Sequence, residues 1–60
     1  MKKLAEHTYG GHIWMALELD NGERHEIDVY IREDGESYKT DADDNEELRR
    51  EIGFAFTRLY

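Results

Sequence analysis

Residues 12–31 read HIWMALELDNGERHEIDVYI, two runs of alternating apolar and polar residues on either side of an Asn21-Gly22 turn signal. Alternation at a period of two is typical of a strand that buries one face. The stretch therefore predicts a β-hairpin. The residues expected on its buried face are Ile13, Met15, Leu17, Leu19, Ile27, Val29 and Ile31.

The length of the loop decides which residues of the hairpin face each other. A two-residue loop would pair Leu17 with Glu26 and place a carboxylate on the apolar face, which is costly. A three-residue loop over residues 20–22, with glycine in the left-handed conformation, pairs Met15 with Ile27 instead. We predict this second register. On the outer face it sets His12 opposite Tyr30, Trp14 opposite Asp28, Ala16 opposite Glu26, and Glu18 opposite Arg24.

A second turn signal, Asp34-Gly35, predicts a third antiparallel strand and a meander over residues 11–40. A two-residue turn there pairs Ile31 with Tyr38 in the core. A three-residue loop would pair Arg32 with Glu36 and move Tyr38 to the outer face. We favour the two-residue turn.

From about residue 44 the apolar residues recur at helical spacing, which predicts a helix over residues 44–59. Asp44 with Glu47 fits a helix start, and Asp41 with Asp44 fits nearly as well. Gly53 costs about 1 kcal/mol within a helix, and the sequence offers no reason for it. Phe54 either packs under the first ten residues or is exposed. The expected core face consists of Leu48, Ile52, Ala55, Phe56 and Leu59.

Residues 1–10 are expected to form a short N-terminal segment, with a candidate strand from Leu4 to Tyr9 before the Gly10-Gly11 pair. Sixty residues allow one small core, so we predict a single domain over residues 1–60. The expected fold class is α+β, with a three-stranded antiparallel β-meander packed against one C-terminal α-helix.

The acidic residues are concentrated in the middle of the chain. Thirteen of the fifteen lie between Glu18 and Glu47, where only three basic residues occur, so this stretch carries ten net negative charges. A field of one sign attracts cationic partners and repels nucleic acid and anionic membranes. The chain has no cysteine and no apolar run of membrane-spanning length, so we expect a soluble cytoplasmic protein.

The sequence shows no complete motif for catalysis, metal binding or cofactor binding. Asp41, Asp43 and Asn45 alternate as in the first half of an EF-hand loop. However, Glu46 stands where that loop needs glycine, and Ile52 stands where it needs the bidentate glutamate. The histidine spacings match no metal site, and so small a core can hardly spare a catalytic pocket. We therefore expect a protein that is not an enzyme.

The outer sheet face is the candidate binding surface, because aromatic side chains among carboxylates suit a basic protein surface. Trp14 either serves this surface or is covered by the N-terminal segment. The helix start adds a second row of acids, and the second turn adds more. The predicted partner-binding residues are Trp14, Glu18, Glu26, Asp28, Tyr30, Glu33, Asp34, Glu36, Asp41, Asp43, Asp44, Glu46 and Glu47.

In size, acidity and lack of catalytic motifs, the chain resembles the small inhibitors of host defence made by phages and mobile elements, notably anti-CRISPR proteins that mimic DNA. The resemblance implies a non-enzymatic inhibitor in the host cytoplasm. Its expected partner is a basic surface, such as a CRISPR–Cas subunit or another nucleic-acid-binding protein. Direct nucleic-acid or membrane binding is not expected, and the chain should be a monomer or a weak dimer.

Two other interpretations stay open. The chain could be an antitoxin-like or accessory module that binds a protein without mimicry. Alternatively, its acidity could be a solubility device or an adaptation to salt. The uneven placement of the charge argues against this last interpretation.

Overall fold

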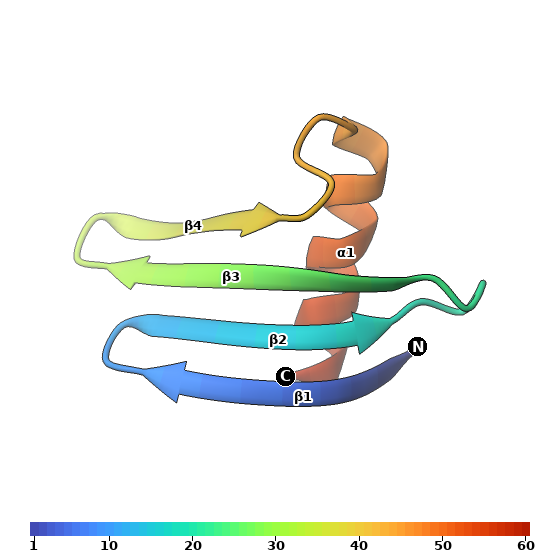
Figure 1. The fold of residues 1–60 in the computed structure, drawn as a ribbon. Helices are drawn as coiled ribbons and strands as arrows, with labels where there is room; N and C mark the ends of the chain where they lie inside the picture. Colours follow the sequence, from blue (N-terminus) through green and yellow to red (C-terminus); the bar gives the residue numbers. More distant parts are fainter.

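The computed structural model describes all residues 1–60 as one antiparallel sheet and one helix (Figure 1). The strands follow each other in the order β1-β2-β3-β4 across the sheet. The α+β class is confirmed, but the expected number of three strands is wrong, because the N-terminal segment forms a fourth. The elements are β1 (Lys2–Tyr9), β2 (His12–Glu18), β3 (Arg24–Arg32), β4 (Gly35–Thr40) and α1 (Glu46–Leu59).

β1 forms through backbone pairing and not through burial of an apolar face, since nearly all of its side chains are exposed. It pairs with β2 from Lys2 opposite Glu18 to Tyr9 opposite His12, with a bulge between Lys3 and Ala5. The chain reverses at Gly10-Gly11, where Gly11 takes a positive φ of 73°. β1 thereby satisfies backbone groups that would otherwise lie free along the edge of β2.

The predicted register of β2 and β3 is confirmed. Met15 lies opposite Ile27, and both are almost fully buried, at 0% and 1% exposure. The N–H of Leu19 donates to the carbonyl of Glu23 at 2.8 Å, which closes a loop over residues 20–22. Gly22 holds the left-handed position of that loop with φ of 89°. The cost of burying carboxylates therefore identified the correct loop length.

The predicted register of β3 and β4 is wrong, although Tyr38 does face the core. The turn uses Glu33 and Asp34, so Tyr38 pairs with Val29 and not with Ile31. Gly35 has φ of 134°, a conformation that side chains rarely adopt. This register also keeps the Glu33 and Glu36 carboxylates from facing each other across the strands.

The helix α1 begins at Glu46, one residue later than a cap at Asp44 would place it. Asn45 is the N-cap, with an extended backbone and a side-chain oxygen that accepts the N–H of Leu48 at 3.1 Å. Asp44 therefore lies outside the helix, and its expected role as the cap is wrong. Glu46 and Glu47 occupy the first turn, where the helix dipole favours negative charge.

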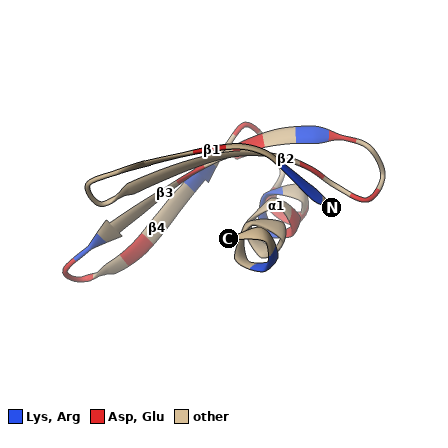
Figure 2. Ribbon diagram, turned by 90° about the horizontal axis from the view of Figure 1, so that it is seen from below, with Lys and Arg blue, Asp and Glu red and all other residues tan.

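The helix α1 lies against one face of the sheet and crosses the strands (Figure 1). Figure 2 shows this layering from the edge, with the strand ends extending past α1 on one side. The expected helix face packs inward, with Ile52 and Ala55 buried and Leu48, Phe56 and Leu59 partly buried. The other sheet face has no helix over it. The buried core consists of Ile13, Met15, Leu17, Leu19, Ile27, Val29, Ala42, Ile52 and Ala55.

Gly53, for which the sequence offered no reason, lies against the ring of Tyr38. A Cβ atom at Gly53 would stand 3.2 Å from two carbons of that ring and 3.3 Å from its hydroxyl oxygen. Any larger residue would therefore push α1 away from β4 or displace the ring.

Candidate functional site

The outer face, which is the sheet face opposite α1, carries a row of stacked aromatic rings. His12 lies between Tyr9 and Tyr30, with ring centroids 5.4 Å and 4.6 Å away and interplanar angles of 24° and 7°. These residues face one another across the three strands β1, β2 and β3. The predicted position of Tyr30 on this face is confirmed, and β1 adds an aromatic residue that the sequence did not place there.

Trp14 occupies the next row of the outer face and is half-buried. β1 lies beside it in the sheet, so His7 packs near its indole with ring centroids 5.4 Å apart. The indole N–H donates to Oε1 of Glu26 at 3.0 Å. The N-terminal segment therefore flanks Trp14 within the sheet, and the indole holds one carboxylate in a fixed position.

Most carboxylates of the outer face lie close to a basic side chain. Glu18 lies 3.2 Å from Arg24, and Asp28 lies 2.7 Å from the ring of His12. Glu26 is different, because no cationic group lies within ion-pair distance of it. It is the one predicted outer-face carboxylate of β2 and β3 with no Lys, Arg or His side chain within ion-pair distance.

The outer edge strands also bring basic residues to this face. In the strand register, Lys39 of β4 lies opposite Asp28, and Lys2 of β1 lies opposite Glu18. Figure 2 shows both blue and red segments on the strands. The outer face is therefore mixed in charge and not uniformly acidic, which the sequence could not reveal without the registers of β1 and β4.

His25 joins two acidic loops at one end of the sheet. Its Nδ1 lies 2.9 Å from Asp41, its Nε2 lies 3.1 Å from Glu23, and its side chain is 14% exposed. A neutral imidazole has one donor, whereas two carboxylates require two, so this geometry favours the imidazolium. Burial lowers the pKa of His25, but the hydrogen bonds to Glu23 and Asp41 outweigh it, and the pKa is raised above its ordinary value of 6.5.

Asp43 and Glu46, which were expected to contact a partner, have contacts within the chain. Asp43 accepts the backbone N–H of Thr40 at 2.8 Å and lies 3.4 Å from Arg49. The Thr40 N–H is the main cause of a lowered pKa for Asp43, and the Thr40 hydroxyl and Arg49 lower it further. Glu46 lies 3.4 Å from Arg50. Asp43 in particular stabilises the connection between β4 and α1.

The remaining acids on the predicted list have no cationic partner within ion-pair distance and lie on two exposed elements. One element is the turn between β3 and β4, which Figure 2 colours red at its tip. The other is the start of α1 with the loop before it. These free carboxylates are Glu33, Asp34 and Glu36 at the turn and Asp44 and Glu47 at the helix.

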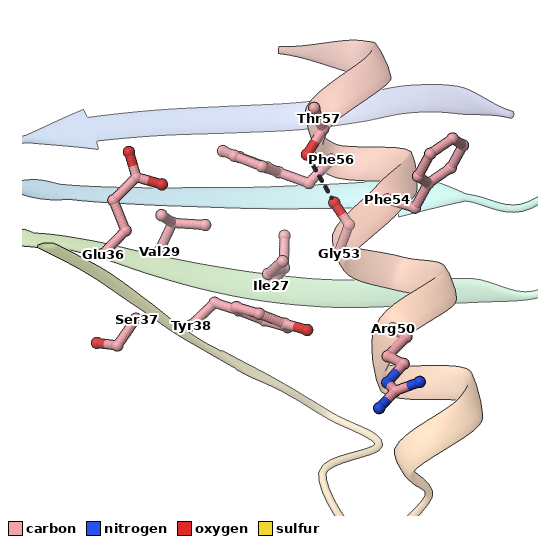
Figure 3. Close-up of a pocket in the computed structure, with 10 residues that line it drawn as sticks. All are labelled: Ile27, Val29, Glu36, Ser37, Tyr38, Arg50, Gly53, Phe54, Phe56 and Thr57. Carbon is pink, nitrogen blue, oxygen red and sulfur yellow. Dashed lines mark hydrogen bonds between the residues drawn. The ribbon is translucent and has the colours of Figure 1, made fainter.

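A groove of about 340 Å³ separates α1 from β3 and β4 (Figure 3). Val29, Tyr38 and Phe56 form its apolar wall. Phe54 lies on the side of α1 away from Val29 and Tyr38, and it is 60% exposed. Of the two expectations for Phe54, exposure is therefore confirmed.

No group of three or more His, Asp or Glu side chains in the structure is arranged to hold a metal ion. No helix is long and apolar enough to cross a membrane. Comparisons with protein-family models, with curated proteins and with solved structures find no match to this chain.

Proposed function

We propose that this protein is a non-enzymatic binding protein that occupies the basic, nucleic-acid-binding surface of a partner protein. It would inhibit that partner by taking the place of nucleic acid, as a DNA mimic of the anti-CRISPR type does. The observation that carries the proposal is the set of free carboxylates on the two exposed elements, the turn between β3 and β4 and the start of α1.

Charges without an intramolecular partner are the ones that can pair with a partner protein without first breaking a contact. Glu33, Asp34 and Glu36 stand together at the end of a projecting hairpin. Asp44 and Glu47 stand around the N-terminus of α1. The chain carries a net charge of −7, so its long-range field guides a basic surface toward these elements.

The same charges disfavour direct binding of nucleic acid, whose phosphates need Lys and Arg. Lysine and arginine side chains that normally contact phosphates would instead contact carboxylates. Binding of this kind weakens steeply as salt rises, because screening acts on exposed charges over about 10 Å at 0.1 M ionic strength. It also excludes nucleic acid from the occupied surface.

The experiment begins with partner capture on the immobilised protein at low and at high salt. The captured partner is then bound to its nucleic acid, and displacement of the nucleic acid is followed as the protein is added. We expect the triple change Glu33→Gln, Asp34→Asn and Glu36→Gln to reduce displacement. Arg58→Gln, which removes a positive charge, is the control and should not reduce it. A partner that binds while keeping its nucleic acid contradicts mimicry.

A second candidate function is an antitoxin-like or accessory module that binds a protein without mimicry. The observation that favours it is Phe54, a large apolar side chain that is 60% exposed on α1. Apolar anchors of this kind carry much of the energy in many interfaces. In that case Phe54→Ser should abolish capture of the partner, and the triple change at the hairpin turn should have little effect.

A further inference from the structure

The outer face contains a small depression beside Trp14. Its volume is about 220 Å³, and Leu4, Trp14, Ala16 and Glu26 are among the residues that line it. Small side chains lie at this place in the sheet, because Ala16, which lines the depression, lies opposite Ala5 of β1. The bulge after Lys3 breaks the register of β1 beside it, next to Leu4. An apolar floor and an indole wall thus lie next to two carboxylates, those of Glu26 and Asp41, of which Asp41 contacts His25.

The positive groups around this depression are already engaged. Arg24 lies 3.2 Å from Glu18 and is drawn toward that carboxylate. Both ring nitrogens of His25 contact carboxylates, those of Glu23 and Asp41. The cations therefore offset other acids, and the charge of Glu26 stands alone at the depression.

The carboxylate of Glu26 is held in place and has one oxygen free. Its Oε1 accepts the indole N–H of Trp14 at 3.0 Å, and no hydrogen bond within the chain occupies Oε2. A positioned carboxylate next to an aromatic side chain suits a planar cation that can both donate hydrogen bonds to the carboxylate and pack against the ring. Guanidinium has this shape and is more weakly hydrated than ammonium.

The chain itself contains an arginine bound in a similar setting. The guanidinium of Arg49 lies 4.0 Å from the ring centroid of Tyr38, and its nitrogens donate to the hydroxyl and the carbonyl of the same residue. No arginine of the chain lies against Trp14, whose ring partner is His7.

We propose that the depression formed by Trp14, Ala16 and Glu26 binds one arginine side chain of the partner. The inference rests on the proposed function in one respect, since it takes the partner to be basic. It adds a specific contact to the general attraction between charges. The free carboxylates at the hairpin turn and the helix start attract the partner, and the depression fixes its orientation through one guanidinium.

Trp14 is the one tryptophan in the chain, so its fluorescence reports directly on this site. The probes are two ten-residue peptides of equal charge, one with arginine and glycine and one with lysine and glycine. We expect the arginine peptide to change the emission of Trp14 and to bind more tightly than the lysine peptide. Glu26→Gln should weaken the arginine peptide about tenfold, the typical effect of losing one charge-assisted hydrogen bond.

Glu51→Gln is the matched control, because it removes one exposed carboxylate that has no ion pair and lies on α1, away from the outer face. It should weaken binding no more than about twofold, as expected for a change in net charge alone. Equal effects of Glu26→Gln and Glu51→Gln would overturn the proposal, as would saturation by the arginine peptide without any change in Trp14 emission.

This test separates the site from the proposed function. If the Trp14 signal depends on Glu26 but no nucleic acid is displaced from a partner, the arginine site stands and mimicry fails. If nucleic acid is displaced while Glu26→Gln has no effect on either peptide, mimicry stands and the arginine site is wrong.

Discussion

Replacing Gly53 with alanine tests the contact between α1 and β4. Alanine is favoured over glycine in a helix by about 1 kcal/mol. The added Cβ, however, would stand 3.2 Å from the ring of Tyr38. Relieving this close contact requires a shift of the Tyr38 ring. Arg49 restrains that ring, because its guanidinium lies 4.0 Å from the ring centroid and donates a hydrogen bond to the Tyr38 hydroxyl at 3.2 Å.

Overpacking of this kind costs typically about 1–3 kcal/mol, which exceeds the gain in helix propensity. We therefore expect Gly53→Ala to lower the free energy of unfolding by about 1 kcal/mol. In a domain of this size that corresponds to a fall in Tm of about 4–8 °C. Urea denaturation gives the free energy, and a thermal melt followed by circular dichroism gives Tm.

The matched background is Tyr38→Leu, which removes the ring atoms that the new Cβ would meet. In that background Gly53→Ala should be stabilising, by about 0.5–1 kcal/mol, because only the backbone effect remains. The sign of the change should therefore depend on residue 38. Stabilisation of equal size in both backgrounds would refute the packing argument, and Gly53 would then be incidental.

Three further changes test other parts of the structure. Asn45→Ala should lower the free energy of unfolding by about 1 kcal/mol through loss of the N-cap, whereas Asp44→Ala should change it by less than about 0.5 kcal/mol. Equal effects of the two changes in urea denaturation would contradict the assignment of the cap. Burial lowers the pKa of His25, but the hydrogen bonds to Glu23 and Asp41 raise it, and the net change is a rise. The stability that His25 contributes is therefore full below pH 6.5 and is lost as pH rises through the raised pKa. The difference in unfolding free energy between wild type and His25→Gln should therefore shrink with rising pH, and a difference that grows would contradict the bridge. The hydrogen bond from the Thr40 N–H lowers the pKa of Asp43. The stability that the Asp43 carboxylate contributes is therefore present above pH 3.8 and lost as pH falls through the lowered pKa. Asp43→Asn should accordingly make the free energy of unfolding fall less steeply at acid pH.

The sequence predicted the central hairpin well because burial constrains it strongly. A shift by one residue between β2 and β3 would have buried Glu26 opposite Leu17, so only one loop length was acceptable. The helix face was equally clear, since Ile52 and Ala55 follow a helical period and do pack on the sheet. In both elements the apolar pattern and the fold depend on the same buried side chains, except at Ile31, whose predicted burial is wrong because its side chain is 49% exposed.

The elements that the sequence placed poorly have little apolar pattern. β1 buries almost nothing, so its existence depends on backbone pairing, and the Gly10-Gly11 hairpin signal was the one available clue. The register of β4 depends on a six-residue strand whose one large apolar residue is Tyr38. That residue packs on Gly53, which is far away in sequence, and no local rule anticipates such a contact.

The candidate site was predicted in composition but not in arrangement. Trp14, Glu26, Asp28 and Tyr30 do share the outer face. The predicted register placed Glu18 opposite Arg24, which do form an ion pair, but the contact of Asp28 with His12 on the neighbouring row was not predicted, because it depends on side-chain conformation. Asp43 illustrates the same difficulty, since it was expected to contact a partner, yet its carboxylate accepts the Thr40 N–H and lies near Arg49. The partner-binding roles themselves stay predictions.

The most direct test of the account is a competition measurement on the captured partner. Its nucleic acid carries a fluorescent label, and anisotropy is followed as the protein is added at two ionic strengths. We expect complete displacement of the nucleic acid, weaker displacement at high salt, and reduced displacement by the variant with Glu33→Gln, Asp34→Asn and Glu36→Gln. A stable complex that contains partner, labelled nucleic acid and this protein together, insensitive to salt, would contradict it.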